Sequence, residues 1–153
     1  QSFLITRLES YDLNVKKRVI KSPKIYLRDS GLLNALLGIE EGNDLMGHPI
    51  YEMSWEGFVI ENIRRELPKW NISFYRSKAG AEIDIILQKG LKKIAVECKV
   101  TSAPIPSKGF YLAKEDLGIS KAYVVCLIED SYPLRHGIMA VSLKELISII
   151  SNM

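Results

Sequence analysis

Two short apolar strings, separated by a connection of six residues, constrain the fold of this chain more than any other feature. In residues 82–87 (EIDIIL) and 94–100 (IAVECKV), on either side of the connection QKGLKK, the polar side chains stand at every second position among apolar ones. Side chains alternate between the two faces of a strand, so this pattern is typical of β-strands. A connection this short favours an antiparallel pair. The sequence therefore predicts a β-hairpin with polar side chains gathered on one face.

The polar side chains of this hairpin are carboxylates and an ammonium group. Glu82 and Asp84 share one face of the first strand, and Glu97 and Lys99 share one face of the second. Mg²⁺ takes oxygen ligands, often one or two carboxylates completed by water and substrate phosphate. A nearby lysine can orient the attacking water or neutralise charge during phosphodiester cleavage. The alternation is also compatible with a surface hairpin that has two salt bridges, so both interpretations stay open.

A helix is predicted over residues 51–67, immediately before these strands, and Pro68 ends it. Glu56 lies inside the apolar arc of this helix and could add a further carboxylate from above the sheet. The side chains that form the arc, at about 100° per residue, are Trp55, Phe58, Val59, Ile63 and Leu67.

The rest of the pattern predicts an α/β fold with a mixed central sheet flanked by helices. Ser107 and Ser142 are expected to begin helices, the second with Glu145 in a capping box. The expected elements after Pro68 are strands over 72–77, 82–87 and 94–100, a helix from Ser107 to Gly118, strands over 122–128 and 138–141, and a helix from Ser142.

The N-terminal region is predicted to be a basic β/α arm. Strands are expected over 2–8 and 24–28, followed by a short helix from Asp29 or Ser30 to Gly38 and a loop over 39–50. Residues 16–28 hold six Lys/Arg and no acid, whereas the whole chain has a net charge of only +3. Such a segment favours a polyanion partner, although a solvated face is the simpler alternative. The predicted DNA-backbone contacts are Lys16, Lys17, Arg18, Lys21 and Lys24.

Several classes of protein are disfavoured by composition. No run approaches the ~18 apolar residues of a membrane helix. Cys98 and Cys126 lack CxxC spacing and are expected to be buried thiols in a reducing cytoplasm. His48 and His136 are too far apart to indicate zinc. The absence of an initiator Met leads us to expect a fragment of a longer protein.

The layout of Glu56 on a helix, then Asp84, then Glu97-Cys98-Lys99 on the next strand resembles the PD-(D/E)XK nuclease superfamily, which includes Holliday-junction resolvases and restriction enzymes. The resemblance implies a restriction-endonuclease-like sheet. It also implies that Asp84, Glu97 and Glu56 bind Mg²⁺ or Mn²⁺ and that Lys99 assists the nucleophile. These would be the catalytic residues of a DNA phosphodiesterase.

A second resemblance covers nearly the whole chain. The strings KRVIKSPKIYLRDSGLLNALLG, WEGFVIENI, FYRSKAGAEIDIIL and VECK are similar to the C-terminal domain of unknown function of a prokaryotic AAA-type ATPase family. An ATPase module precedes the domain in that family, and this chain has no GxxxxGK phosphate loop. The implied organisation is an arm over 1–47 linking to the absent module and a nuclease-like domain over 48–153. The basic arm could dock onto that module instead of DNA, and a non-catalytic module binding DNA or protein is the alternative function.

Overall fold

The computed structural model describes residues 4–11, 19–29, 31, 38 and 51–153. Most of the expected helix before Gly38, the loop over 39–50 and the residues Lys16, Lys17 and Arg18 therefore lie outside the described residues. The elements, in chain order, are β1 (Ile5–Leu8), β2 (Lys24–Leu27), α3 (Tyr51–Glu66), β3 (Asn71–Arg76), β4 (Glu82–Lys89), β5 (Lys92–Cys98), α4 (Lys108–Asp116), β6 (Lys121–Val125), β7 (Tyr132–Pro133), the 3-10 turn η1 (Arg135–Gly137), β8 (Met139–Val141) and α5 (Leu143–Ser151).

The predicted α/β fold with a mixed central sheet is confirmed. The main sheet has six strands in the order β3-β4-β5-β6-β8-β7. The strands β3, β4 and β5 are antiparallel neighbours, β5, β6 and β8 are parallel, and β7 is antiparallel to β8. The hairpin of 82–87 with 94–100 is thus confirmed as the β4–β5 pair.

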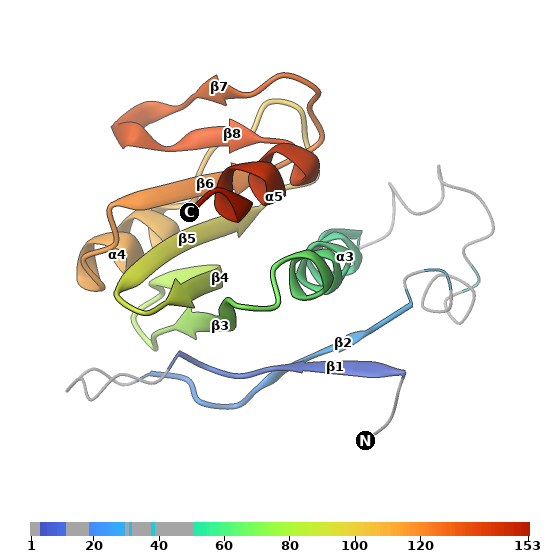
Figure 1. Ribbon diagram of the computed structural model, residues 1–153. Helices are drawn as coiled ribbons and strands as arrows, with labels where there is room; N and C mark the ends of the chain where they lie inside the picture. Colours follow the sequence, from blue (N-terminus) through green and yellow to red (C-terminus); the bar gives the residue numbers. More distant parts are fainter. Residues whose placement is uncertain (1–3, 12–18, 30, 32–37, 39–50) are drawn as a thin grey trace.

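Helices cover both faces of this sheet, and a two-stranded arm lies beside it (Figure 1). Buried side chains of α3 and α5 pack on one face in a cluster that we call the α3-side core. Buried side chains of α4 pack on the opposite face in a second cluster, the α4-side core. Strands buried on both faces explain the continuous apolar string of β6, which lies between β5 and β8.

The helix starts follow from local capping chemistry, as predicted. The Ser107 hydroxyl accepts a hydrogen bond from the Phe110 amide at 3.1 Å, and Ser142 does the same for Glu145 at 3.1 Å. After α4, Gly118 has a φ of +62°, a left-handed conformation that favours glycine. The two serine contacts satisfy backbone donors that would otherwise lack a partner at the helix start.

Some strand boundaries differ from the prediction. The β5 strand ends at Cys98, so Lys99 lies one residue beyond it, and β6 ends at Val125 rather than at residue 128. The sequence does not predict the two-residue β7, which contains Pro133 and lies at the edge of the sheet. Proline lacks a backbone donor and is tolerated in edge strands. A strand of two residues is also too short for an alternation of polar and apolar side chains to be recognised in the sequence.

The β1–β2 arm is a separate antiparallel hairpin. It reaches the main fold through Leu8 and Tyr26, which belong to the α3-side core. Isolated bridges join the chain next to the arm to β3 and its end, at Ser10 with Phe74 and at Val19 with Ser77. The arm thus crosses the α3 side of the molecule without joining the six-stranded sheet (Figure 1).

Candidate active site

A β-bulge in β4 decides the position of Asp84. The pairing of β3 with β4 shifts by one residue between the partners of Ile83 and Ile86. Ile83 packs into the α4-side core together with Ile86, whereas Ile85 packs into the α3-side core. The simple alternation predicted for this strand, with Ile83 and Ile85 on one face, is therefore wrong at Asp84. A bulge inserts an extra residue and can re-aim a side chain.

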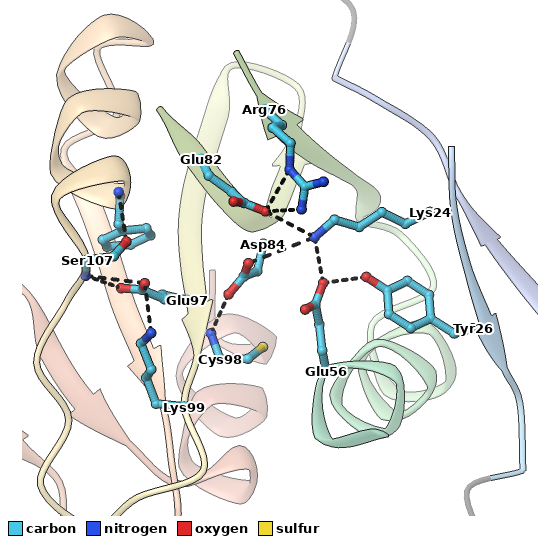
Figure 2. A network of polar contacts seen from close by, with 11 residues as sticks. Lys24, Tyr26, Glu56, Arg76, Glu82, Asp84, Glu97, Cys98, Lys99 and Ser107 are labelled. Carbon is cyan, nitrogen blue, oxygen red and sulfur yellow. Dashed lines mark hydrogen bonds and ion pairs between the residues drawn. The ribbon is translucent and has the colours of Figure 1, made fainter. Parts of the chain in front are cut away.

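The Asp84 carboxylate of β4 lies between the Cys98 amide of β5 and the Lys24 ammonium of the arm (Figure 2). Its Oδ2 accepts a hydrogen bond from the Cys98 amide at 2.9 Å, and its Oδ1 lies 3.9 Å from the Lys24 ammonium. Burial, and then the negative charge of Glu56, raise the pKa of Asp84 to about 7 against the opposing effects of that amide and Lys24. The carboxyl group therefore titrates near neutral pH.

Lys24 of β2 places its ammonium among three carboxylates. The Nζ atom lies 2.9 Å from Glu56 Oε1, 3.5 Å from Glu82 Oε1 and 3.9 Å from Asp84 Oδ1. Burial lowers the pKa of Lys24, but the charges of these carboxylates outweigh burial and raise that pKa above its ordinary value. The ammonium is therefore charged at neutral pH, and in the structure it contacts acidic side chains of the protein itself.

Tyr26 completes the contacts of Glu56 from the same strand. Residues two apart on a strand share a face, and the Tyr26 hydroxyl donates to the same Glu56 oxygen that Lys24 contacts. Burial, followed by the Glu56 charge, raises the pKa of Tyr26, so the hydroxyl remains a donor. The ring lies close to α3 at Gly57, where an added Cβ would be 3.2 Å from it. A side chain at residue 57 would therefore crowd the strand.

Glu82 joins this acidic group to β3. Arg76 donates to Glu82 Oε1 through Nη2 at 2.5 Å and through Nε at 3.0 Å. The hydrogen bond to Glu82 raises the pKa of Arg76. Because Lys24 also lies 3.5 Å from this atom, two cations share one carboxylate oxygen.

Glu97 and Lys99 form a second group of contacts. Glu97 is 5% exposed, and its carboxylate accepts from the Ser107 amide at the start of α4, at 3.1 and 3.3 Å. Lys99 Nζ lies 3.5 Å from Glu97 Oε1. Along β5, Glu97 alternates with Val96 and Cys98 of the α3-side core, which places it toward α4. The charged side chains therefore form two groups instead of the single cluster expected. Cys98 links them, because its amide donates to Asp84 and it follows Glu97 in the chain.

The two groups are close enough to interact electrostatically. The charge of Glu97 contributes to the raised pKa of Asp84. The Lys24 ammonium also shows that Glu56, Glu82 and Asp84 together accommodate a positive charge, and carboxylate oxygens are the kind of ligand that hard cations take. As the side chains stand, the described part of the chain has no three His, Cys, Asp or Glu residues arranged to hold a metal ion.

Sequence reasoning missed the part that the arm plays in this site. The sequence pattern favours DNA as the partner of Lys24, whereas the structure places both Lys24 and Tyr26 on Glu56. Their spacing of two residues is a signal that they share a face of one strand. No local pattern identifies their partner, because 30 or more residues separate the arm from α3.

A family model described as "Domain of unknown function (DUF4143)" matches residues 51–146, which include all of the site except the arm. The chain belongs to this family. A second domain of unknown function (DUF8612) matches residues 1–43. The DUF4143 part therefore contains Glu56, Asp84, Glu97 and Lys99, whereas Lys24 comes from the segment matched by the other model.

Two curated relatives are uncharacterised proteins of Mycobacterium bovis and Mycobacterium tuberculosis. Each is 32% identical over 147 residues, which is 96% of this chain and 33% of the relative. The chain therefore spans about a third of the length of the curated relatives it matches. A solved assembly of Thermococcus gammatolerans McrB AAA+ hexamers with bound McrC has a chain that matches with a TM-score of 0.46 and 14% identity, over 66% of this chain and 33% of that one.

The described part of this DUF4143 chain contains no helix that is long and apolar enough to cross a membrane. Cys98 and Cys126 are both buried free thiols, as predicted. Burial raises the pKa of the Cys98 thiol well above its usual range. The thiol beside Asp84 is therefore protonated at neutral pH and is a poor metal ligand in that form.

Proposed function

We propose that this domain is a metal-dependent, nuclease-like phosphodiesterase that acts on DNA as an accessory module of an AAA-type ATPase. The observation on which the proposal rests is the hydrogen bond from the Cys98 amide to Asp84 Oδ2 at 2.9 Å. This hydrogen bond brings the Asp84 carboxylate of β4 to the backbone of Cys98, the residue between Glu97 and Lys99 in the Glu-x-Lys string. The PD-(D/E)XK resemblance relies on this arrangement.

In this proposal the cation is Mg²⁺ or Mn²⁺, and its ligands are Asp84 and Glu97, with the Cys98 carbonyl and with Glu56 through water. The bound metal would supply an activated water molecule and stabilise charge on the phosphodiester. Lys99 would hold the attacking water near the scissile phosphate. Its ion pair with Glu97, at 3.5 Å, supports this role because it keeps the ammonium beside a proposed ligand.

The proposed DNA contacts lie on the arm and its surroundings. Lys21 is exposed in the structure, whereas Lys16, Lys17 and Arg18 lie outside the described residues. Exposed Lys and Arg side chains bind the phosphate backbone without reading the base sequence. Because Lys24 contacts carboxylates of the site, we assign backbone contact to the other four residues.

The ATPase partner is proposed from two observations. The segment KSPKIYLRDSGL and three further strings resemble the C-terminal domain of AAA-type ATPases. The curated relatives are about three times as long as the matched region, since that region is 33% of their length. A nucleotide-dependent module in the same longer protein would fit this organisation.

A non-catalytic module that binds DNA or protein is the second candidate. It is favoured by the pairing of every proposed carboxylate ligand within the described structure. Glu56 and Asp84 contact Lys24, and Glu97 contacts Lys99 and the Ser107 amide. A retained fold does not by itself establish an activity.

The test compares metal binding and DNA cleavage by the full-length protein. Mn²⁺ titration calorimetry and cleavage of branched and linear DNA are measured for wild type, Asp84→Ala, Lys99→Ala and Asp130→Ala. We expect Asp84→Ala to lose metal binding and Lys99→Ala to retain it while losing cleavage. Asp130 is exposed, so its variant controls for the removal of one carboxylate. If wild type binds no Mn²⁺ at millimolar concentration and cuts neither DNA, the binding module is the better account.

A further inference from the structure

We propose that the β1–β2 arm is an autoinhibitory plug, in which the Lys24 ammonium competes with a divalent cation for the carboxylates of Glu56 and Asp84. The inference rests on the proposed function in one respect, because it assumes that these carboxylates lie at a metal site. It adds a regulatory role for the arm that neither the nuclease resemblance nor the family match assigns.

The first step is the position of the ammonium. Its nitrogen lies 2.9, 3.5 and 3.9 Å from one oxygen each of Glu56, Glu82 and Asp84. Magnesium and calcium lie about 2.0–2.6 Å from their oxygen ligands, so a cation bound to Asp84, with Glu56 reached through water, would lie close to the ammonium that contacts both carboxylates. A divalent cation and an ammonium so close together repel each other, and this repulsion disfavours binding of both at once. Lys24 and the metal therefore compete.

The second step is how firmly Lys24 is held in that position. The side chain is only 16% exposed, and its ammonium lies 5.3 Å from the centre of the Phe74 ring. Tyr26, two residues along the strand, anchors β2 by its hydrogen bond to Glu56. Gly57 allows this close approach, since even a Cβ would be 3.2 Å from the Tyr26 ring. The contact is thus part of the packing between β2 and α3, unlike a surface ion pair.

The third step is that the arm can leave without breaking the main sheet. The six-stranded sheet is complete without the arm, so withdrawal breaks the backbone hydrogen bonds that Tyr11 and Ile20 donate to the edge strand β3 but none within that sheet. An isolated two-stranded hairpin is only marginally stable in water, so its order depends on contacts such as that of Tyr26 in the α3-side core. Withdrawal would therefore expose Glu56 and Asp84 while leaving β4 and β5 paired.

The energetic consequence is a reduced apparent affinity for metal. When the competent state is only partly populated, the apparent dissociation constant equals the intrinsic value divided by the competent fraction. An arm that is open about a tenth of the time would weaken binding about tenfold by this relation. Removing the Lys24 charge should therefore strengthen metal binding by the same factor.

The decisive measurement is Mn²⁺ titration calorimetry on the full-length protein. Four proteins are compared: wild type, Lys24→Met, Lys24→Arg and Lys78→Met. We expect Lys24→Met to bind on the order of tenfold more tightly than wild type, and Lys24→Arg to resemble wild type. Lys78→Met is the matched control, because it removes the same charge from an exposed residue outside the proposed DNA contacts and should stay within about twofold of wild type.

Hydrogen exchange gives a readout that does not depend on a variant. In wild type, saturating Mn²⁺ should accelerate amide exchange in β2 while leaving β4 and β5 protected. Unchanged exchange in β2 would overturn the plug, and this result decides the matter even if Lys24→Met fails to fold.

The outcomes also separate this inference from the proposed function. Equal Mn²⁺ affinity of wild type and Lys24→Met would overturn the plug and leave the metal site standing. An equal increase in Lys78→Met would attribute the effect to net charge, which also overturns the plug. If neither wild type nor Lys24→Met binds Mn²⁺, the metal-dependent function fails, and the plug fails with it.

Discussion

The Lys24 ammonium and the Glu56 carboxylate lie 2.9 Å apart, although 32 residues separate them along the chain. This contact joins a strand of the arm to the helix that precedes the main sheet (Figure 2). The positive charge of Lys24 partly neutralises the negative charge of Glu56, Glu82 and Asp84. Both the stability of the domain and its proposed binding of cations should therefore depend on the residues around this pair.

Removing the carboxylate charge of Asp84 should change how stability depends on pH. The folded pKa is about 7 against an ordinary value of 3.8, so the folded state binds this proton more tightly than the unfolded state. The group therefore makes the protein less stable as pH rises from about 4 to about 7. Asp84→Asn should remove that slope and exceed wild type by at least ~1 kcal/mol above pH 7, with little difference near pH 4. Urea unfolding at several pH values measures this.

The control for that experiment is Asp130→Asn, which removes a carboxylate from an exposed position. Its unfolding curve should follow wild type at each pH. Parallel profiles for wild type and Asp84→Asn would show that Asp84 does not hold its proton as inferred.

The Tyr26 hydroxyl should contribute to the stability of the arm. Tyr26→Phe removes the donor to Glu56 and keeps the ring that packs in the α3-side core. We expect a destabilisation of about 1.5–3 kcal/mol, the usual range for a hydrogen bond to a charged group. Exchange of β2 amides should quicken more than that of β4. An unchanged β2 would indicate that packing alone holds the arm.

Gly109 should not tolerate alanine, even though it lies in a helix. A Cβ on Gly109 would lie 2.5 Å from the Gly80 carbonyl oxygen, so α4 would have to move away from the β3–β4 turn. Alanine normally stabilises a helix by about 1 kcal/mol relative to glycine, but we expect Gly109→Ala to destabilise the protein by about 1–3 kcal/mol overall. Lys108→Ala, at the neighbouring exposed position, should be nearly neutral. Thermal unfolding distinguishes the two.

The basic segment should dominate the salt dependence of DNA binding. Replacing Lys16, Lys17 and Arg18 with glutamine should lower the slope of log affinity against log salt by about 0.9 for each phosphate that these residues neutralise in wild type. A matched triple variant at the exposed Lys69, Lys121 and Lys144 controls for net charge. Fluorescence anisotropy across a salt series measures both. Equal slopes for the two variants would favour docking of the arm onto an ATPase module.

Much of the fold could be predicted from the sequence because its causes are local. The β4–β5 hairpin follows from alternation and a short connection, and Ser107 and Ser142 cap their helices with side chains only three residues from the amides that they bind. The Glu97 and Lys99 pair also follows from spacing, since residues two apart on a strand share a face.

Tertiary structure decided where Asp84 points and which carboxylate Lys24 contacts. The bulge at Asp84 arises in the pairing with β3, and the apolar run at the end of the string EIDIIL does not show by itself where the strand bends. The segment around Lys24 contains no acid, so no neighbour in the sequence identifies its partners. These partners come from α3 and β4, and only packing of β2 against Gly57 brings them within reach. Local patterns encode the faces of each element, whereas contacts between distant elements depend on how those faces pack together.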